Sequence, residues 1–550
     1  MVTSLVKKGI SAFVSKQTNI FTAAFFIILT TIFSQILGLL KYRLLVALFG
    51  ASSEVGVFFA AFRIPDFVFQ VVIAGALSSS FIPLFSEYLR NDRKRDAFTF
   101  TSSLINIGLV FFIFVSAVII VFSYQLSAMI APGFSKEELI LMSQLMIIIQ
   151  LSQVFFILGT VITAVLQSFQ HFLIPGIASA FYNFGIILGL IVFSSFLGFG
   201  IFGAAVGVLI GSILFCVVQL PLLKSTGFTF IPRFSVTSGL RQVLHLMIPR
   251  SLTLIVSQLA ITANVFFASF VSARGLVVLD LAQTLVMAPV LLFGQSIAQA
   301  SFPALSLKAD NKKEFISIFV SSFNQILFLT IPISVLLIVL RIPMVRLFFG
   351  ASRFDWDATV DTGLTLAYFS ISVAAQALIY LLSRSFFALK DAKTPFFVTL
   401  GSVIANIIMS YVFILVYHLP IFSLALSFSV SSIASAVIMV FLFDRKISLP
   451  KIEILITIGK MTIAGIVMGI TLYVPIKLLD QLVFDTTRTF NLFLLTSIAS
   501  ALGLTAYIFL TWLLDISEAY YIFAVIKKFG SKNKILVQLS ELIDGSRLNP

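Results

Sequence analysis

Long apolar runs, separated by short charged or turn-rich breaks, dominate the sequence. Each run reaches the roughly 20 residues that a helix needs to cross a bilayer, and exceeds the roughly 10-residue strands of a membrane barrel. The pattern therefore predicts an all-α polytopic membrane protein with about 14 transmembrane helices. The predicted spans lie near residues 20–49, 57–86, 98–123, 138–168, 172–196, 199–223, 243–273, 279–306, 315–341, 359–388, 395–418, 420–443, 453–479 and 491–514.

Composition supports a membrane protein and argues against an enzyme. Only 11% of the 550 residues are charged and 59% are hydrophobic, whereas a soluble domain carries roughly 25% charged residues. The single cysteine, Cys216, forbids an internal disulfide, and the three histidines are far apart in the chain. Paired acids, a nucleophile constellation and a metal-ligand cluster are all missing, so we expect no enzymatic activity and no cofactor.

Positive charge alternates between the predicted loops. Counted over the loops and termini, 24 Lys and Arg fall on one side of the membrane and seven on the other. Because positive residues collect in cytoplasmic loops, this asymmetry predicts that both termini are cytoplasmic and that the number of spans is even. The net charge of +14 is then explained by orientation and anionic lipid, and a nucleic-acid partner is not expected.

An internal repeat of 220 residues divides the predicted spans. Pro83 and Pro303 close the second and eighth spans, and Pro175 and Pro395 open the fifth and eleventh. Six spans per copy is an even number, so the two copies have the same orientation, as in transporters built from parallel repeats. We predict a six-helix lobe at 1–223, a second at 224–445, two further helices at 446–515 and a cytoplasmic amphipathic tail at 516–550.

Polar side chains follow one face of several predicted spans, where they must point to protein or water. Lys41 and Arg63 offer positive charge to a phosphate group through charge-assisted hydrogen bonds. Arg43 lies about 200° from Lys41 around the helix, so we expect it at the membrane interface. An alternative is local pairing of Arg63 with Asp66. The candidate substrate-binding residues are Lys41, Arg63, Gln35, Asp66, Gln70, Arg250 and Thr284.

Several short motifs are spread along the chain. They include Phe-Gly-Ala-Ser at 49–52, Ala-Phe-Arg-Ile-Pro at 61–65, Gly-Ala-Leu-Ser-Ser-Ser-Phe-Ile-Pro at 75–83, Ala-Pro-Gly-Phe at 131–134, Phe-Pro-Ala-Leu-Ser at 302–306 and the stretch 384–395. Together they resemble the motifs of the MurJ (MviN) lipid II flippases, within the multidrug/oligosaccharidyl-lipid/polysaccharide exporter superfamily. The resemblance covers roughly residues 20–440. It implies two six-helix lobes, a lipid-tail groove formed with two extra helices, and an ion gradient or membrane potential as the driving force.

The sequence departs from this family at charged positions. Gln35 replaces an arginine, Lys41-Tyr42 replaces Arg-Asp, and Gly56 replaces an aspartate. Phe69-Gln70 stands where twin arginines are expected, Ala74 where an acid is expected, and Gln283-Thr284 where the family has Asp-Arg. The scaffold motifs are thus kept while most of the cavity charges are absent.

The resemblance implies that lipid II, an undecaprenyl-linked peptidoglycan precursor, is moved from the inner to the outer leaflet by alternating access. The alternatives are a flippase for another lipid-linked glycan, a cation-coupled drug antiporter, and a transport-inactive envelope scaffold. The expected partners are a lipid-linked pyrophosphate glycan and membrane lipid, with cell-wall synthesis proteins as candidates. The expected location is the bacterial cytoplasmic (inner) membrane.

Overall fold

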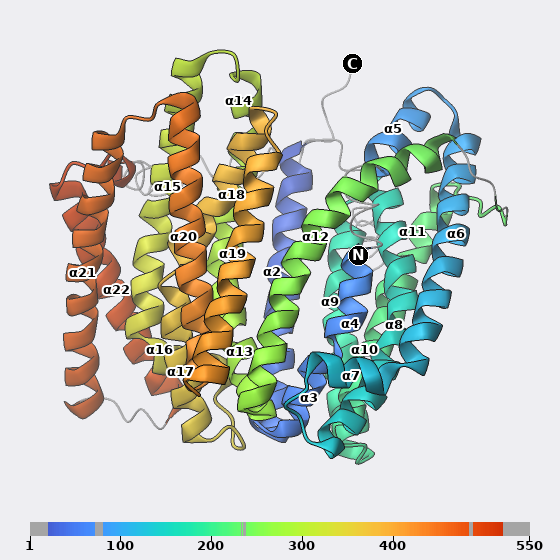
Figure 1. Cartoon of the computed structure of the whole chain (residues 1–550), viewed down its shortest axis with the longest axis horizontal. Helices are drawn as coiled ribbons and strands as arrows, with labels where there is room; N and C mark the ends of the chain where they lie inside the picture. The colour runs from blue at the N-terminus through green and yellow to red at the C-terminus, as the bar shows by residue number, and fades with distance from the viewer. Residues whose placement is uncertain (1–19, 72–80, 233, 235–237, 483–487, 521–550) are drawn as a thin grey trace, which may run out of the picture. The chain divides into compact units, whose positions relative to one another are not determined.

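The computed structural model describes residues 20–71, 81–232, 234, 238–482 and 488–520. The described chain is helical throughout (Figure 1). The elements of the first half are α2 (Ile20–Phe49), α3 (Ser53–Ala61), α4 (Arg63–Phe69), α5 (Ile82–Arg90), α6 (Lys94–Val121), α7 (Ser123–Ile130), α8 (Lys136–Ser168), α9 (Leu173–Leu188), η3 (Gly189–Phe196), α10 (Ile201–Val217), α11 (Leu220–Ser225) and α12 (Ser238–Val271).

The second half continues the same architecture. Its elements are α13 (Ala273–Pro289), η4 (Val290–Gln295), α14 (Ser296–Leu307), α15 (Lys312–Val339), α16 (Arg341–Phe349), α17 (Trp356–Ser370), α18 (Val373–Ala388), α19 (Lys393–Tyr411), η5 (Val412–Val416), α20 (Phe422–Ile447), α21 (Lys451–Leu482) and α22 (Thr489–Leu513). The segments η3, η4 and η5 are π-helical turns within longer helices.

Twelve helices of the described chain are long and apolar enough to cross a membrane. A thirteenth span results if α17 and α18, which meet at a bend of 42°, form one crossing. The predicted second span, 57–86, includes residues 72–80, which lie outside the described residues. A multi-pass helical protein is therefore confirmed, and the count of 14 stays a prediction.

The structure extends the internal repeat well beyond the proline landmarks. Helix α8 spans 136–168, and the pair α17 and α18 spans 356–388, an offset of 220 at both ends. Gln170 and Lys390 both have positive φ, as do Gly198 and His418. The π-helical turns η3 and η5 end at Phe196 and Val416, again 220 residues apart. The chain is therefore built from two repeats, and α21 and α22 lie outside them.

The chain forms two compact units. The first contains residues 1–282, 348–365 and 399–428, and the second contains 283–347, 366–398 and 429–550. Both units draw on both sequence repeats, so the repeat boundaries at 223 and 445 are not the boundaries of these units. The proposed lobes remain predictions, as does the amphipathic tail, because residues 521–550 lie outside the described part.

Close helix packing holds the first unit together. Helix α9 lies beside both α2 and α10, and α10 also lies beside α8 (Figure 1). A Cβ added at Gly189 would come within 2.3 Å of the Cα of Gly207, and one at Gly185 equally close to the Cα of Gly211. The backbones of α9, η3 and α10 thus touch along their length, as small residues permit between membrane helices.

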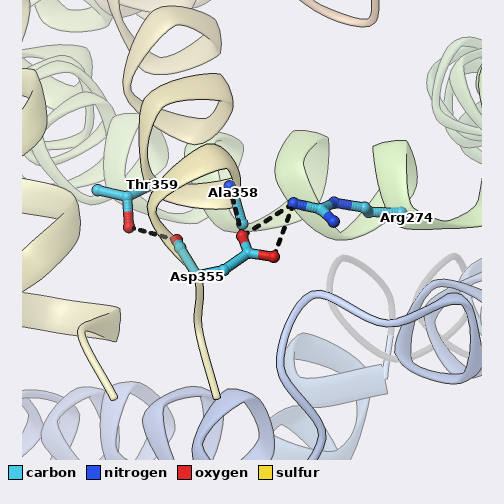
Figure 2. A network of polar contacts seen from close by, with 4 residues as sticks. All are labelled: Arg274, Asp355, Ala358 and Thr359. Atoms are coloured by element: carbon cyan, nitrogen blue, oxygen red, sulfur yellow. Dashed lines mark hydrogen bonds and ion pairs between the residues drawn. The ribbon is translucent and has the colours of Figure 1, made fainter. Parts of the chain in front are cut away.

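A second close approach joins the start of α13 to α3 within the same unit. A Cβ at Gly56 would lie only 1.8 Å from the carbonyl oxygen of Ala273. Nearby, the Arg274 Nη2 donates to both carboxylate oxygens of Asp355, at 2.8 and 3.1 Å (Figure 2). The Asp355 Oδ1 also accepts a hydrogen bond from the backbone N–H of Ala358 and so caps the start of α17. These contacts join α3, α13 and α17 at one end of the unit.

Aromatic side chains fill the second unit. Phe319, Phe386 and Phe443 are fully buried, and the rings of Phe319 and Phe443 have centroids 4.6 Å apart. Helix α21 packs on α15 and on α22. The buried Tyr507 hydroxyl of α22 donates to the carbonyl of Phe328 in α15 at 3.1 Å. The two helices outside the repeats are therefore fastened to this unit through α15.

Candidate functional site: a charged cavity in the first unit

A cavity of about 230 Å³ lies within the first unit. Its walls come from α2, α3, α4, α9, η3 and α13, with Phe62 at the junction of α3 and α4. Aromatic and aliphatic side chains surround a small group of charged ones. The lining residues are Lys41, Tyr42, Leu45, Phe58, Phe59, Phe62, Arg63, Asp66, Tyr182, Ile186, Leu190 and Asp280.

Arg63 pairs with Asp280 across the cavity wall. Its Nη2 donates to Asp280 Oδ1 at 2.7 Å and to Oδ2 at 3.0 Å. Both side chains are only 17% exposed. The partner of Arg63 is therefore Asp280, 217 residues away, and local pairing with Asp66 is not the arrangement observed. The Arg63 Nε is buried without a hydrogen-bond partner, so the guanidinium retains an unused donor.

Asp66 and Lys41 occupy the same cavity with different partners. The Asp66 Oδ1 accepts a hydrogen bond from the side-chain amide of Gln153, on α8, at 3.3 Å. The Lys41 ammonium lies 4.7 Å from the centre of the Tyr42 ring, close enough for a cation–π interaction. Among the described residues Lys41 is joined to no carboxylate by an ion pair.

The cavity therefore holds two positive and two negative side chains. Because buried charges are stable only when they are compensated, the four groups depend on one another. An incoming anion has two places to bind. It can bind the Lys41 ammonium directly, or it can bind the Arg63 guanidinium, either by displacing Asp280 or in addition to it. An incoming cation would find the Asp66 and Asp280 carboxylates in the same space.

Three of the predicted site residues line the cavity, namely Lys41, Arg63 and Asp66. Gln35 is exposed on α2 and does not line it, and half-buried Gln70 at the end of α4 does not either. Thr284 lies on α13 but belongs to the second unit. The side chain of Arg250, on α12, is outside the described residues. Arg43 is half-buried and is not a lining residue, in keeping with the geometric argument about its face.

Two lining residues, Asp280 and Tyr182, and the Asp66 partner Gln153 were missed as site residues. Asp280 had a readable signal, because an acid within an apolar span needs a partner. Gln153 is one of several glutamines of α8 and Tyr182 lies in a mostly apolar α9, so only the packing of these helices reveals that they belong to the site. Asn183, next to Tyr182 on α9, does not line the cavity; its side-chain amide donates to the backbone carbonyl of Ser34 at 3.1 Å and links α9 to α2.

The second unit carries a larger groove of different chemistry. It has a volume of about 730 Å³ and lies among α15, α18, α20 and α21. Its walls are almost wholly apolar, including Phe323, Leu327, Ala375, Val440 and Ile458. Asp444 and Lys451 lie at one end, joined by an ion pair of 2.8 Å. The groove suits a long apolar chain rather than a charged group.

Comparison with known proteins gives a consistent result. The family model described as "Lipid II flippase MurJ" matches residues 45–493. A "Probable lipid II flippase MurJ" of Buchnera aphidicola subsp. Acyrthosiphon pisum is 28% identical over 460 residues, covering 82% of this chain and 89% of that protein. The corresponding Thermotoga maritima protein is 29% identical over 452 residues, covering 80% and 88%.

Solved structures agree. A structure titled "Lipid II flippase MurJ, inward closed conformation" superposes with a TM-score of 0.74 and 25% identity, covering 89% of this chain and 98% of that one. An inward-facing multidrug resistance MATE family transporter of the MOP superfamily gives a TM-score of 0.65 at 15% identity, covering 76% and 94%. The second match carries the fold alone.

Proposed function

The chain belongs to the lipid II flippase MurJ family, and we propose that it moves lipid II from the inner to the outer leaflet of the bacterial inner membrane by alternating access. The family consists of transporters rather than enzymes, and the chain is a multi-pass membrane protein. The observation that carries the proposal is the placing of Lys41 and Arg63 in one cavity of the first unit, among aromatic and aliphatic side chains.

The pyrophosphate of the substrate would use the cavity's positive groups. The Lys41 ammonium is available to an anion, and the Arg63 guanidinium has an unused Nε donor besides its bonds to Asp280. A phosphate that reaches Arg63 competes with Asp280 for the same guanidinium. Such an exchange keeps Arg63 compensated before and after substrate enters, so the cavity never holds an unpaired arginine.

The apolar groove of the second unit would receive the undecaprenyl tail. Its lining side chains are hydrocarbon over most of their surface, so a polyprenyl chain lying there stays out of water during transport. Separate sites for headgroup and tail allow the charged part to cross through protein while the tail stays in an apolar environment.

We further propose that both termini are cytoplasmic, because positive residues are unequally divided between the two sets of loops. We also propose that cell-wall synthesis proteins are its protein partners.

The direct test is complementation. A host whose essential lipid II flippase can be depleted should grow when this chain is expressed. Failure to grow, with the protein present in the membrane at normal amounts, would favour a flippase for another lipid-linked glycan or a scaffold.

Cysteines introduced at Ser52 and Asn91 in a Cys216→Ser background test the orientation of the chain in the membrane. A reagent excluded from the cytoplasm should label only the cysteine at position 52.

A second candidate, a cation-coupled antiporter, is favoured by the two carboxylates in the cavity. Asp66 and Asp280 both line it, and Asp66 is held by an amide rather than by an arginine. If Asp66→Asn alone abolishes transport while Lys41→Gln and Arg63→Gln remain active, the cavity binds a cation and not the anionic headgroup. Loss in the basic variants with a functional Asp66→Asn supports the flippase.

A further inference from the structure

A second polar pocket, of about 820 Å³, lies in the second unit between α15, α21 and the end of α22. It is distinct from the charged cavity, which belongs to the first unit, and it shares only Leu449 and Lys451 with the lining of the apolar groove. Neither the substrate headgroup site nor the tail groove described above accounts for it. Its charged lining residues are Lys451, Glu453, Lys460, Asp515 and Glu518.

Two buried polar side chains face this pocket. Asn324 is only 8% exposed, and its Oδ1 is buried without a hydrogen-bond partner. Glu518 is 6% exposed, and its Oε2 accepts a hydrogen bond from the neighbouring Ser517 hydroxyl at 2.9 Å. A buried acceptor without a donor is energetically unfavourable. The pocket therefore presents one acceptor without a donor, Asn324 Oδ1, beside the Glu518 carboxylate.

Positive charge lies in the same pocket. The Lys460 ammonium donates to the backbone carbonyl of Leu514 at 2.7 Å, which uses one of its three donors. Lys451 is paired with Asp444. The lining thus combines two ammonium groups with three carboxylates, a pattern that suits a ligand carrying both charges better than a simple anion.

The mouth of the pocket is a lipid-facing surface. Ile452 and Ile456 line it and are 77% and 53% exposed, and both lie on α21, a candidate membrane span. Apolar side chains exposed on such a helix face hydrocarbon. Lys451 is the first residue of α21, where positive side chains meet the headgroup region. A ligand would therefore enter from the membrane and not from water.

We propose that this pocket binds the headgroup of a zwitterionic aminophospholipid. The primary ammonium would donate to Asn324 Oδ1 and to Glu518, the phosphate would accept from Lys460, and an acyl chain would lie along Ile452 and Ile456. A divalent cation is less suitable, since no group of three acidic, histidine or cysteine side chains fit to hold a metal occurs in the described chain. The bound lipid would join α15, α21 and α22 at one end of the second unit.

Native mass spectrometry of the full chain, purified in detergent and reloaded with single lipids, tests the proposal. Phosphatidylethanolamine, its monomethyl and dimethyl derivatives and phosphatidylcholine carry the same charge and acyl chains but progressively fewer N–H donors. We expect retention to fall along this series by about tenfold overall, the effect of losing charge-assisted hydrogen bonds. Equal retention of all four lipids, or preferential retention of phosphatidylglycerol, overturns the proposal.

Variants locate the site. Glu518→Gln and Asn324→Leu should each abolish the preference for phosphatidylethanolamine. The matched control is Gln325→Leu, which removes an amide from the adjacent position of α15, outside the pocket, and should keep the preference. If both pocket variants retain the lipid like the control, the site is elsewhere. Should a variant fail to fold, the methylation series on the unaltered chain still decides the headgroup chemistry.

Discussion

The charged cavity of the first unit and the apolar groove of the second unit differ in both size and chemistry. The cavity measures about 230 Å³ and holds four ionisable side chains in compensating positions. The groove measures about 730 Å³ and has hydrocarbon walls, with charge only at one end. We therefore expect transport to depend on side-chain charge in the cavity of the first unit. In the groove of the second unit we expect it to depend on side-chain volume.

Filling the groove should have the largest effect. Ala375 lines it, and Ala375→Trp would occupy space that a lipid tail needs. We expect complete loss of complementation at a normal amount of protein in the membrane. The control is Ala501→Trp, which places the same side chain on the exposed surface of α22 and should complement normally. Growth supported by Ala375→Trp would remove the groove from the transport pathway.

Changing charge in the cavity should have the next largest effect. Lys41→Gln and Arg63→Gln keep polarity and much of the length while removing the positive charge. A hydrogen bond to a charged group is worth roughly 1.5–3 kcal/mol, so each variant should lose about ten- to a hundredfold in apparent affinity for lipid II, measured in a reconstituted flipping assay. Arg43→Gln removes a positive charge of the same helix outside the cavity and should behave as the unaltered chain. Normal transport by all three would show that the positive charges of the cavity do not bind the headgroup.

Exposed charges of the first unit should contribute much less than the buried charges of the cavity. Changing an exposed pair therefore tests whether the burial of a charge determines the size of its effect. The Arg274–Asp355 pair is 40% and 54% exposed, and exposed ion pairs contribute about 0–1 kcal/mol. Arg274→Gln should therefore shift the thermal unfolding of the purified protein only slightly. Asp355→Ala should shift it more, because it also removes the cap of α17, worth about 1 kcal/mol. A large shift with Arg274→Gln would show that the pair is needed to hold the unit together.

A polar contact of the second unit gives a predicted effect on stability alone, and one that depends on pH. Burial would raise the pKa of Asp391, but hydrogen bonds from Lys446 and Thr394 outweigh it and hold the pKa at about 2. A carboxyl with a depressed pKa stabilises the fold fully above its unfolded pKa of about 3.9, and this contribution is lost as the pH falls towards 2. Asp391→Asn should therefore unfold at a lower temperature than the unaltered chain at pH 7.

The difference between Asp391→Asn and the unaltered chain should narrow as the pH falls from about 4 to about 2. Thermal unfolding of both proteins at a series of pH values measures it. Ser383, a short polar side chain on α18, provides a control variant, Ser383→Ala, whose difference should not change over this interval. A constant difference for Asp391→Asn across the same range would show that the charge of Asp391 does not stabilise the fold.

The fold was predictable from the sequence because the order and length of the apolar runs indicate both the membrane spans and the repeat. The cavity was only partly predictable. Lys41, Arg63 and Asp66 were found because ionisable groups in apolar spans require an explanation, whereas the pairing of Arg63 with Asp280 joins residues 217 positions apart. No periodicity within one helix can reveal such a pair. Gln153 was missed because it is one of four glutamines in α8, and the sequence does not show which of them contacts the site.

One departure from the family pattern acquires a physical reason. Gly56 stands where the family is expected to carry aspartate, and any Cβ at this position would meet the Ala273 carbonyl at 1.8 Å. The start of α13 thus occupies the space that a side chain would need. The sequence shows only that a charge is missing, and the packing explains why restoring it would force α3 and α13 apart.

The shared π-helical turns carry information about the order of events in the ancestry of the chain. Such a turn accommodates one more residue than the α-helical turn around it. The offset between the repeats is 220 at Gln170 and Lys390, before the turns, and again 220 at Gly198 and His418, after them. Had the extra residue entered only one copy after duplication, the offset would change across the turn. An insertion into one copy alone after duplication is therefore excluded, and both copies carry the widened turn at the same place in the repeat.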